Sequence, residues 1–259
     1  MIDWTYTLAG TLTGFVIGLT GVGGGALMTP ILLLVFGIHP TTAVATDLWF
    51  AAFTKLAGAR IHHTNGNVDW QVVKRLWSGS LPMALLVVVL VSMGAHIGKV
   101  DWLTKGIGVI VLITAIGLLA APKMVALARK KQSGQPEQFE NIQSVLTVVG
   151  GAVLGTCVAL TSVGAGVLGS VMLLYLYPLR MTPHRLVATD IVHAIPLAVV
   201  AGLGYLFAGM VDWWMLMSLL LGSIPAVIGG SKLASHITGR WIQIALACVL
   251  IAAGLKVLW

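Results

Sequence analysis

The sequence predicts an all-α integral membrane protein built from two inverted repeats of about five helical segments each. The first observation is composition: the 259 residues are 58% hydrophobic and 9% charged, with a mean hydropathy of +0.98. A soluble domain carries about 25% charged residues, so this chain lacks a polar shell. The second observation is that motifs of the first half return in the second half. The third is that equivalent connections of the two halves differ in basic charge, which sets the orientation of the repeats.

The first repeat, 1–121, is a series of apolar segments that predict helices. They lie near 5–20, 25–36, 44–61, 72–97 and 102–121. The first two are short, because a membrane-spanning helix needs about 20 residues. Four glycines separate them: Gly21, Gly23, Gly24 and Gly25. So many glycines cannot form an ordinary helix interior, and we predict a helix break there. In hydrocarbon such a break persists only where protein or a wet cavity satisfies the backbone, which makes it a candidate binding site.

A polar segment, 122–144, is predicted to be a cytoplasmic linker, and the second repeat, 145–259, follows it. The apolar segments of this repeat lie near 145–160, 165–178, 186–208, 213–234 and 240–258. Its first two members are again short, and residues 161–166 (TSVGAG) form a second predicted break between them.

Matching motifs relate the two halves at a nearly constant separation. At 141 residues, Thr20, Val22, Gly23 and Gly25 match Thr161, Val163, Gly164 and Gly166. At 143 residues, 45–47 (ATD) matches 188–190, and 68–70 (VDW) matches 211–213. Coincidence over so many positions is implausible, so the sequence predicts an internal duplication.

The basic residues predict that the two repeats are inverted. Most fall in four groups: Arg60 with Lys74 and Arg75; Lys123 with Arg129, Lys130 and Lys131; Arg180 with Arg185; and Lys232 with Arg240. Basic residues concentrate on the cytoplasmic side of a membrane. The connection after the third helix is basic in the first repeat but bare in the second, at 208–212, whereas Arg180 and Arg185 match the uncharged 37–42. We therefore expect both termini outside, and each broken pair to be either two short crossings or a re-entrant hairpin.

The two breaks are the leading candidates for a binding site. A helix that starts inside the membrane presents free N–H groups and the positive end of its dipole, which together attract an anion. The predicted cradle consists of Thr20, Gly23, Gly24, Gly25, Thr161, Ser162, Gly164, Ala165 and Gly166. The alternative is close helix packing through small residues. The symmetric placement of the glycines beside a break favours the cradle.

The repeated ATD motif places Thr46 with Asp47 and Thr189 with Asp190 near the start of an apolar helix. One interpretation is helix capping, because Thr and Asp accept hydrogen bonds from the first free N–H groups. The other is gating or proton coupling, since carboxylates within a membrane usually serve a transport pathway. Both interpretations stay open at this point.

Two further polar residues lie inside these apolar helices. Lys55 is a candidate substrate-binding residue, because a buried cation that faces the site would attract an anion. His193 titrates near physiological pH and is a candidate for proton coupling, with a structural interhelical role as the alternative. His62 and His63 lack further ligands at metal spacing, and we predict no metal site or cofactor.

The paired breaks, the ATDL and ATDI motifs and the two VDW motifs together resemble the sulfite exporter TauE/SafE family, also called TSUP. The resemblance covers nearly the whole chain except the central linker, and Ala165 stands where the second copy would carry its middle glycine. It implies a multi-pass transporter of the bacterial inner membrane for sulfite, thiosulfate or related small sulfur-containing anions.

We therefore expect a transporter that exports small sulfur-containing anions by alternating access, with its substrate between the two breaks. The expected partners are this anion, the lipid bilayer and, as one open assembly, a second copy in a homodimer; nucleic acid is not expected, because the basic residues are scattered through short loops. The protein is not expected to be an enzyme. The alternatives are a proton- or sodium-coupled importer, an accessory subunit without transport, and an intramembrane hydrolase that uses Ser162 and His193.

Overall fold

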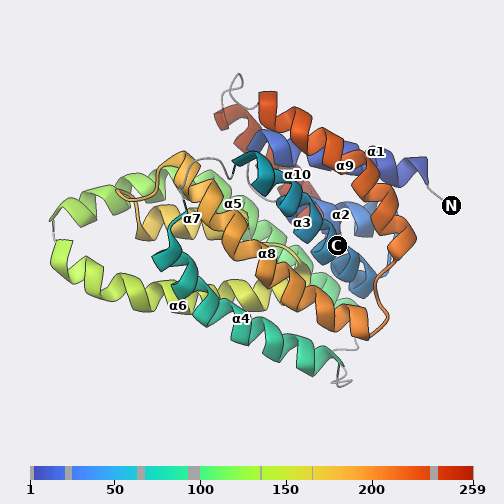
Figure 1. Ribbon diagram of the computed structural model, residues 1–259, viewed down its shortest axis with the longest axis horizontal. Helices are drawn as coiled ribbons and strands as arrows, with labels where there is room; N and C mark the ends of the chain where they lie inside the picture. The colour runs from blue at the N-terminus through green and yellow to red at the C-terminus, as the bar shows by residue number, and fades with distance from the viewer. Residues whose placement is uncertain are drawn as a thin grey trace.

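The computed structural model describes residues 3–20, 25–62, 68–92, 100–134, 136–164, 166–233 and 239–258. Every regular element in these ranges is an α-helix (Figure 1). The first half contains α1 (Trp4–Thr20), α2 (Gly25–Leu34), α3 (Pro40–His62), α4 (Trp70–Ser92) and α5 (Val100–Gly134). The second half contains α6 (Pro136–Thr161), α7 (Val167–Leu176), α8 (Pro183–Phe207), α9 (Trp213–Leu233) and α10 (Gly239–Leu258). The all-helical prediction is confirmed, as are the short second helix of each half and the interruption at residues 162–164 before α7; residues 21–24, the first predicted interruption, lie outside the described residues.

The helices suit a membrane rather than water. Within the described ranges, five helices are long and apolar enough to cross a bilayer: α4, α5, α6, α8 and α9. Large apolar side chains also cover the outside of the bundle. On α6, Val145, Val149 and Val153 recur every four residues and are each more than half exposed. A continuous apolar stripe on one helix face would be unfavourable in water and is favourable against lipid tails.

The helices α5 and α6 extend further than the apolar pattern predicts. They reach Gly134 and begin at Pro136, so most of the polar segment 122–144 is helical. Its lysines, arginines, alanines and glutamines are good helix formers, which explains why the helix continues beyond the apolar stretch. Figure 1 shows the joined ends of α5 and α6 reaching beyond the rest of the bundle. The cytoplasmic location of this segment stays a prediction.

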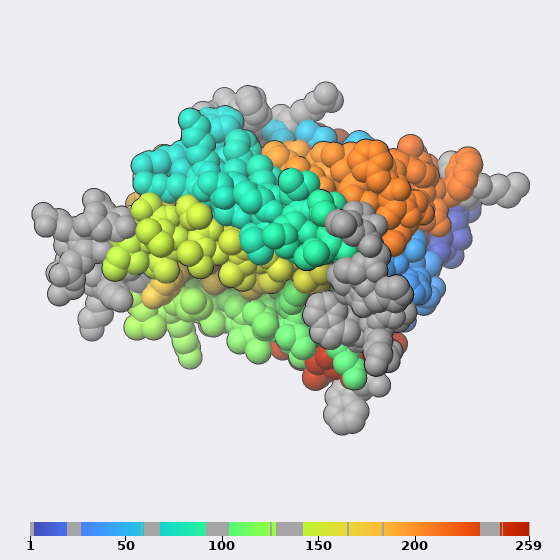
Figure 2. Space-filling model, turned by 90° about the horizontal axis from the view of Figure 1, so that it is seen from below, coloured from blue at the N-terminus to red at the C-terminus, as the bar shows by residue number. Residues whose placement is uncertain are grey.

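The two halves are interlaced through reciprocal packing. Helix α1 packs most closely on α9, and its counterpart α6 packs most closely on α4. Figure 1 shows the first pair together, and Figure 2 shows α6 between α4 and α5 on one face. Glycines allow this close approach: a Cβ at Gly10 would lie 2.1 Å from the Leu219 carbonyl oxygen, and one at Gly151 would lie 2.7 Å from that of Leu76. Gly10 and Gly151 are 141 residues apart and Leu76 and Leu219 are 143 apart, the same separations as in the matched motifs.

The paired VDW motifs start helices. Asp69 Oδ1 accepts a hydrogen bond from the Val72 N–H at 3.3 Å, and Asp212 Oδ1 accepts one from the Met215 N–H at 3.0 Å. Each aspartate thus caps the helix that begins at the following tryptophan. These caps fix where α4 and α9 enter the bundle.

Candidate functional site

Asp47 is a buried carboxylate held by α2. Helix α3 begins at Pro40, so Asp47 lies in its second turn and the capping interpretation is wrong for it. The side chain is fully buried. Its Oδ2 accepts hydrogen bonds from the Thr29 N–H at 3.1 Å and from the Thr29 hydroxyl at 2.5 Å. Among the described residues, its Oδ1 has no hydrogen-bond partner.

The second break has a strained backbone. Helix α6 ends at Thr161, whose hydroxyl donates to the Cys157 carbonyl oxygen at 2.7 Å and accepts from the Val163 N–H at 3.1 Å. Ser162 has a positive φ of 60°, which is rare for a residue other than glycine. Gly164, at φ 113°, adopts a conformation that only glycine takes readily. Gly166 then leads into α7. Strain of this kind concentrates at functional sites.

Helix α2 and the second break meet at Asp47. Thr29 belongs to the short helix that follows the first break, and Ser162 belongs to the second break. The Ser162 hydroxyl faces the Asp47 carboxyl but makes no hydrogen bond to it, and it is buried without another partner in the described part of the chain. The hydroxyl of Thr161, in contrast, is occupied by its own helix end. Of the predicted hydroxyl donors whose side chains are described, Ser162 alone is free to hold a ligand.

Asp190 is also fully buried but has a charged partner. It lies in the second turn of α8, because that helix begins at Pro183 and is capped by Thr182; the capping interpretation is therefore wrong here as well. The Lys55 Nζ lies 2.9 Å from Asp190 Oδ2, and both side chains are at most 5% exposed. Lys55, predicted to attract substrate, thus has its charge balanced by Asp190. A ligand anion would have to compete with this carboxylate.

His193 contacts a serine that sequence reasoning missed. Its Nε2 lies 3.0 Å from the Ser80 hydroxyl, and both side chains are buried. In the described residues, the hydroxyl at Nε2 of His193 is therefore that of Ser80 and not that of Ser162, the serine of the hydrolase alternative. Ser80 could have been found, because it recurs as Ser223 in the second repeat.

The two threonines of the ATD motifs join the halves reciprocally. The Thr46 hydroxyl accepts a hydrogen bond from the Asp212 N–H at 3.2 Å, and the Thr189 hydroxyl accepts one from the Asp69 N–H at 3.1 Å. Each threonine thus positions the start of a helix in the other half. The residue that follows each threonine is the buried carboxylate, so the contact at each helix start lies next to the site in the sequence.

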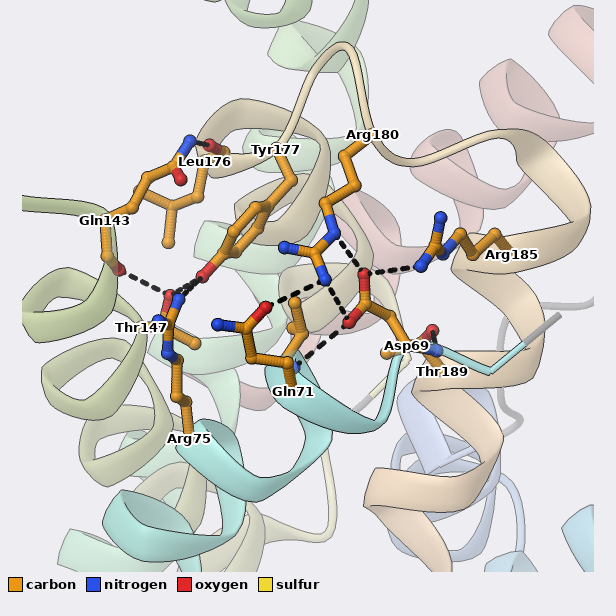
Figure 3. A network of polar contacts seen from close by, with 11 residues as sticks. Asp69, Gln71, Arg75, Gln143, Thr147, Leu176, Tyr177, Arg180, Arg185 and Thr189 are labelled. Atoms are coloured by element: carbon orange, nitrogen blue, oxygen red, sulfur yellow. Dashed lines mark hydrogen bonds and ion pairs between the residues drawn. The ribbon is translucent and has the colours of Figure 1, made fainter. Parts of the chain in front are cut away.

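Asp69 also anchors a polar network at one end of the bundle (Figure 3). Arg180 donates to Asp69 Oδ1 at 2.8 Å, and the Arg185 guanidinium lies 3.0 Å from Asp69 Oδ2. Nearby, the Tyr177 hydroxyl contacts Arg75 and Thr147. Sequence reasoning used these arginines only for topology and missed their shared partner. Asp212, the counterpart of Asp69, is exposed and has no such arginines in the described ranges.

Several predicted site residues fall where the structure makes no description. Gly23, Gly24 and Ala165 lie outside the described residues, and the side chain of Thr20 does too. Gly25 is described as the first residue of α2. The cradle itself therefore stays a prediction.

Two grooves on the outside of the bundle are apolar. One, of about 350 Å³, is lined by α1, α2 and α10, including Leu12, Leu27 and Leu246. The other, of about 260 Å³, continues along α2 and α10. Neither contains Asp47, Asp190 or Lys55, and their lining suits lipid tails rather than an anion.

Comparison with known proteins identifies relatives over the full length. The family model described as Sulfite exporter TauE/SafE matches residues 6–257. The probable membrane transporter protein YjnA of Bacillus subtilis is 36% identical over 255 residues, covering 97% of this chain and 98% of that protein. The probable membrane transporter protein YdhB of the same organism is 26% identical over 259 residues, covering 96% and 97%. A probable membrane transporter protein of Xylella fastidiosa is 24% identical over 263 residues, covering 97% and 93%. No solved structure matches the chain.

Proposed function

Because the chain belongs to the sulfite exporter TauE/SafE family of membrane transporters, we propose that it exports small sulfur-containing anions such as sulfite by alternating access. The substrate binds between the two helix breaks, at the free N–H groups of the two short helices. The protein resides in the bacterial inner membrane with both termini outside.

The observation that carries this proposal is that α2 and the second break converge on Asp47. Thr29 of α2 and Ser162 of the second break both face this one carboxyl group. The short helix that follows the first predicted break and a residue of the second break, which lie far apart in the sequence, are thus side by side in the protein core. Discontinuous helices that meet in this way are typical of transporter binding sites.

The reciprocal contacts support alternating access. Thr46 binds the start of α9, and Thr189 binds the start of α4, so each half positions helices of the other. Rocking of one repeat against the other would expose the site first to one side and then to the other. The inside-negative membrane potential favours outward movement of anions by about 2.3 kcal/mol per charge per 100 mV. Export therefore needs no other energy source.

A second candidate function is coupled uptake of thiosulfate or another small anion. Asp47 favours it, because a buried carboxylate without a counter-charge repels an anion beside it. The anion and a cation that neutralises Asp47 would then bind together. Uptake against the membrane potential requires such a coupled cation.

Counterflow of labelled sulfite in proteoliposomes tests transport. Preloading with unlabelled sulfite should accelerate entry of labelled sulfite, and thiosulfate, sulfoacetate, sulfate and taurine should be compared as competitors. Gly24→Val should abolish counterflow while leaving membrane insertion intact, because a β-branched residue cannot take the place of glycine at the predicted break. Normal counterflow in this variant would contradict the cradle, and absence of counterflow for every anion in the unmodified protein would contradict the function.

A further inference from the structure

Two buried carboxylates occupy matching positions but have different partners. Asp190 and Asp47 are the third residues of the two ATD motifs. Asp190 forms an ion pair with Lys55, whereas Asp47 receives hydrogen bonds from Thr29 and no basic group in the described part of the chain contacts it. Asp190 thus has a positively charged partner within the protein, whereas Asp47 has none in the described part of the chain.

The packing of α3 against α8 explains the difference. Lys55 contacts Asp190. Trp49, which precedes Lys55 on α3, donates a hydrogen bond to the carbonyl oxygen of Gly202, which follows Asp190 on α8. The two helices therefore cross with opposite directions, and the separation of the matched motifs relates the pair Lys55–Asp190 to the pair Ala198–Asp47. Ala198 is also the residue that matches Lys55 at the separation of the repeats. A buried alanine stands where symmetry would place a second lysine.

A second pair of residues shows the same replacement. Ser80 contacts His193, and the matching residues are Ser223 and Phe50. Because phenylalanine cannot hydrogen-bond through its side chain, the Ser223 hydroxyl is buried without a partner in the described ranges. Lys55 and His193 thus provide partners for Asp190 and Ser80. The matching polar groups, Asp47 and Ser223, have no lysine or histidine partner among the described residues.

An isolated carboxylate in the membrane interior is strongly unfavourable. Burying a charge without a partner costs far more than burying a paired one, so such a group binds a cation or takes up a proton. The two unpartnered oxygens at this place are Asp47 Oδ1 and the Ser162 hydroxyl. Ser162 directly follows the C-terminal end of α6, where helix carbonyl groups point outward and the dipole is negative. Oxygen ligands at such helix ends bind coupling ions in transporters.

We infer that Asp47 Oδ1 and the Ser162 hydroxyl form a site for a monovalent cation, either a proton or Na⁺, which supplies the charge that Lys55 supplies to Asp190. The inference rests on the proposed function in one respect, namely that the cation and the transported anion occupy neighbouring positions. Neutralising Asp47 removes the repulsion of the anion, so each raises the affinity of the other by the same factor. The built-in pair of Lys55 and Asp190 takes no part in the coupling.

Other titratable groups around Asp47 lie on the elements that pack with α3. They are Lys55 on α3 and Asp190, His193 and Tyr205 on α8; Cys157 lies on α6, which packs on α8. The described sequence of α2 contains none. The charged side chains described on α5 and α9, Lys105, Lys123 and Lys232, are exposed, as is Asp212 before α9. A pH effect that arises at Asp47 must therefore be separated from one at Asp190 or His193.

The test is cation-dependent stability of the purified full chain in detergent. Thermal unfolding is followed while NaCl replaces choline chloride at constant ionic strength, and separately while pH is lowered from 9 to 5 without sodium. A cation that binds only the folded protein raises Tm, by about 3 °C or more at ten times its Kd. A rise with sodium assigns Na⁺ to the site, and a rise only with acid assigns the proton.

Substitutions then locate the effect. Asp47→Asn removes the carboxylate and should abolish the cation dependence, whereas Asp190→Asn should retain it. Ala198→Lys supplies a covalently attached charge and should also abolish it, and Ala198→Met controls for the added side-chain length. If Ala198→Lys does not fold, the comparison of Asp47→Asn with Asp190→Asn still decides the matter.

The outcomes separate this inference from the proposed function. A cation dependence that is lost in Asp47→Asn supports the site, even if sulfite counterflow is absent. No dependence on sodium or pH in the unmodified protein would overturn the site, as would a dependence that persists in Asp47→Asn, even if counterflow is normal.

Discussion

The buried pair of Lys55 and Asp190 gives the sharpest prediction on stability. Its two charged atoms lie 2.9 Å apart, and the side chains are 5% and 2% exposed. At an effective dielectric constant of 20, charges at this distance attract by about 6 kcal/mol, before the cost of removing them from water. Lys55→Met removes one charge and leaves the other buried alone. Breaking a buried pair in this way costs about 3–5 kcal/mol.

The experiment is a double-mutant cycle on thermal unfolding in detergent. Lys55→Met should lower Tm by about 6–20 °C, on the scaling for chains of 150–250 residues. The double variant Lys55→Met with Asp190→Asn should recover most of that loss, because no unpaired charge remains. Lys105→Met, the same change at an exposed lysine of α5, serves as the control and should leave Tm nearly unchanged.

Two results would refute this reasoning. If Lys55→Met unfolds at the same temperature as the unmodified protein, the ion pair contributes nothing to stability. If the double variant is as unstable as the sum of the two single variants, the two residues are not coupled. The same variants also address function: because Asp190 balances its charge, Lys55 should affect stability as well as anion affinity.

Two further predictions concern the interlaced packing and the helix caps. Gly155→Leu should prevent α6 from packing on α4, because even a Cβ there would lie 2.2 Å from the Ser80 carbonyl oxygen. Gly229→Leu is the control, because no atom lies close to a Cβ at that position. Equal yields of the two folded variants in size-exclusion chromatography would contradict the packing. Asp69→Ala removes a cap and the contacts to Arg180 and Arg185, whereas Asp212→Ala removes only a cap. The first change should therefore destabilise the protein by about 1–2 kcal/mol more than the second in denaturant unfolding, and equal losses would show that the half-exposed arginines add nothing.

The fold was predictable because its signals are local and repeated. The low charge content, the apolar segments and the glycine breaks each act over a few residues, and the helices follow them closely. The boundaries near Pro40 and Pro183 were missed because the first turns of α3 and α8 are not apolar. That error placed Asp47 and Asp190 near a helix end and made capping plausible. Both in fact lie within the helices, where a carboxylate needs a partner.

The partners within the site were less predictable. Lys55 and Asp190 were singled out separately, but nothing in the sequence states that α3 and α8 cross with these two residues in contact. The contacts of His193 with Ser80 and of Asp69 with Arg180 likewise join distant segments. The alignment of the repeats contained a usable signal: Ala198 and Phe50 replace Lys55 and His193, so the two copies could not have identical interiors.

The packing of α1 against α9 has a consequence for biosynthesis. Helix α1, Trp4–Thr20, finds its main neighbour only after Trp213–Leu233 has been made. Until then the glycines of α1, Gly10, Gly14 and Gly18, lack the backbone of α9 on which they pack in the folded protein. The order of synthesis and the order of assembly therefore differ, because α1 reaches its final place only after α9 has been made.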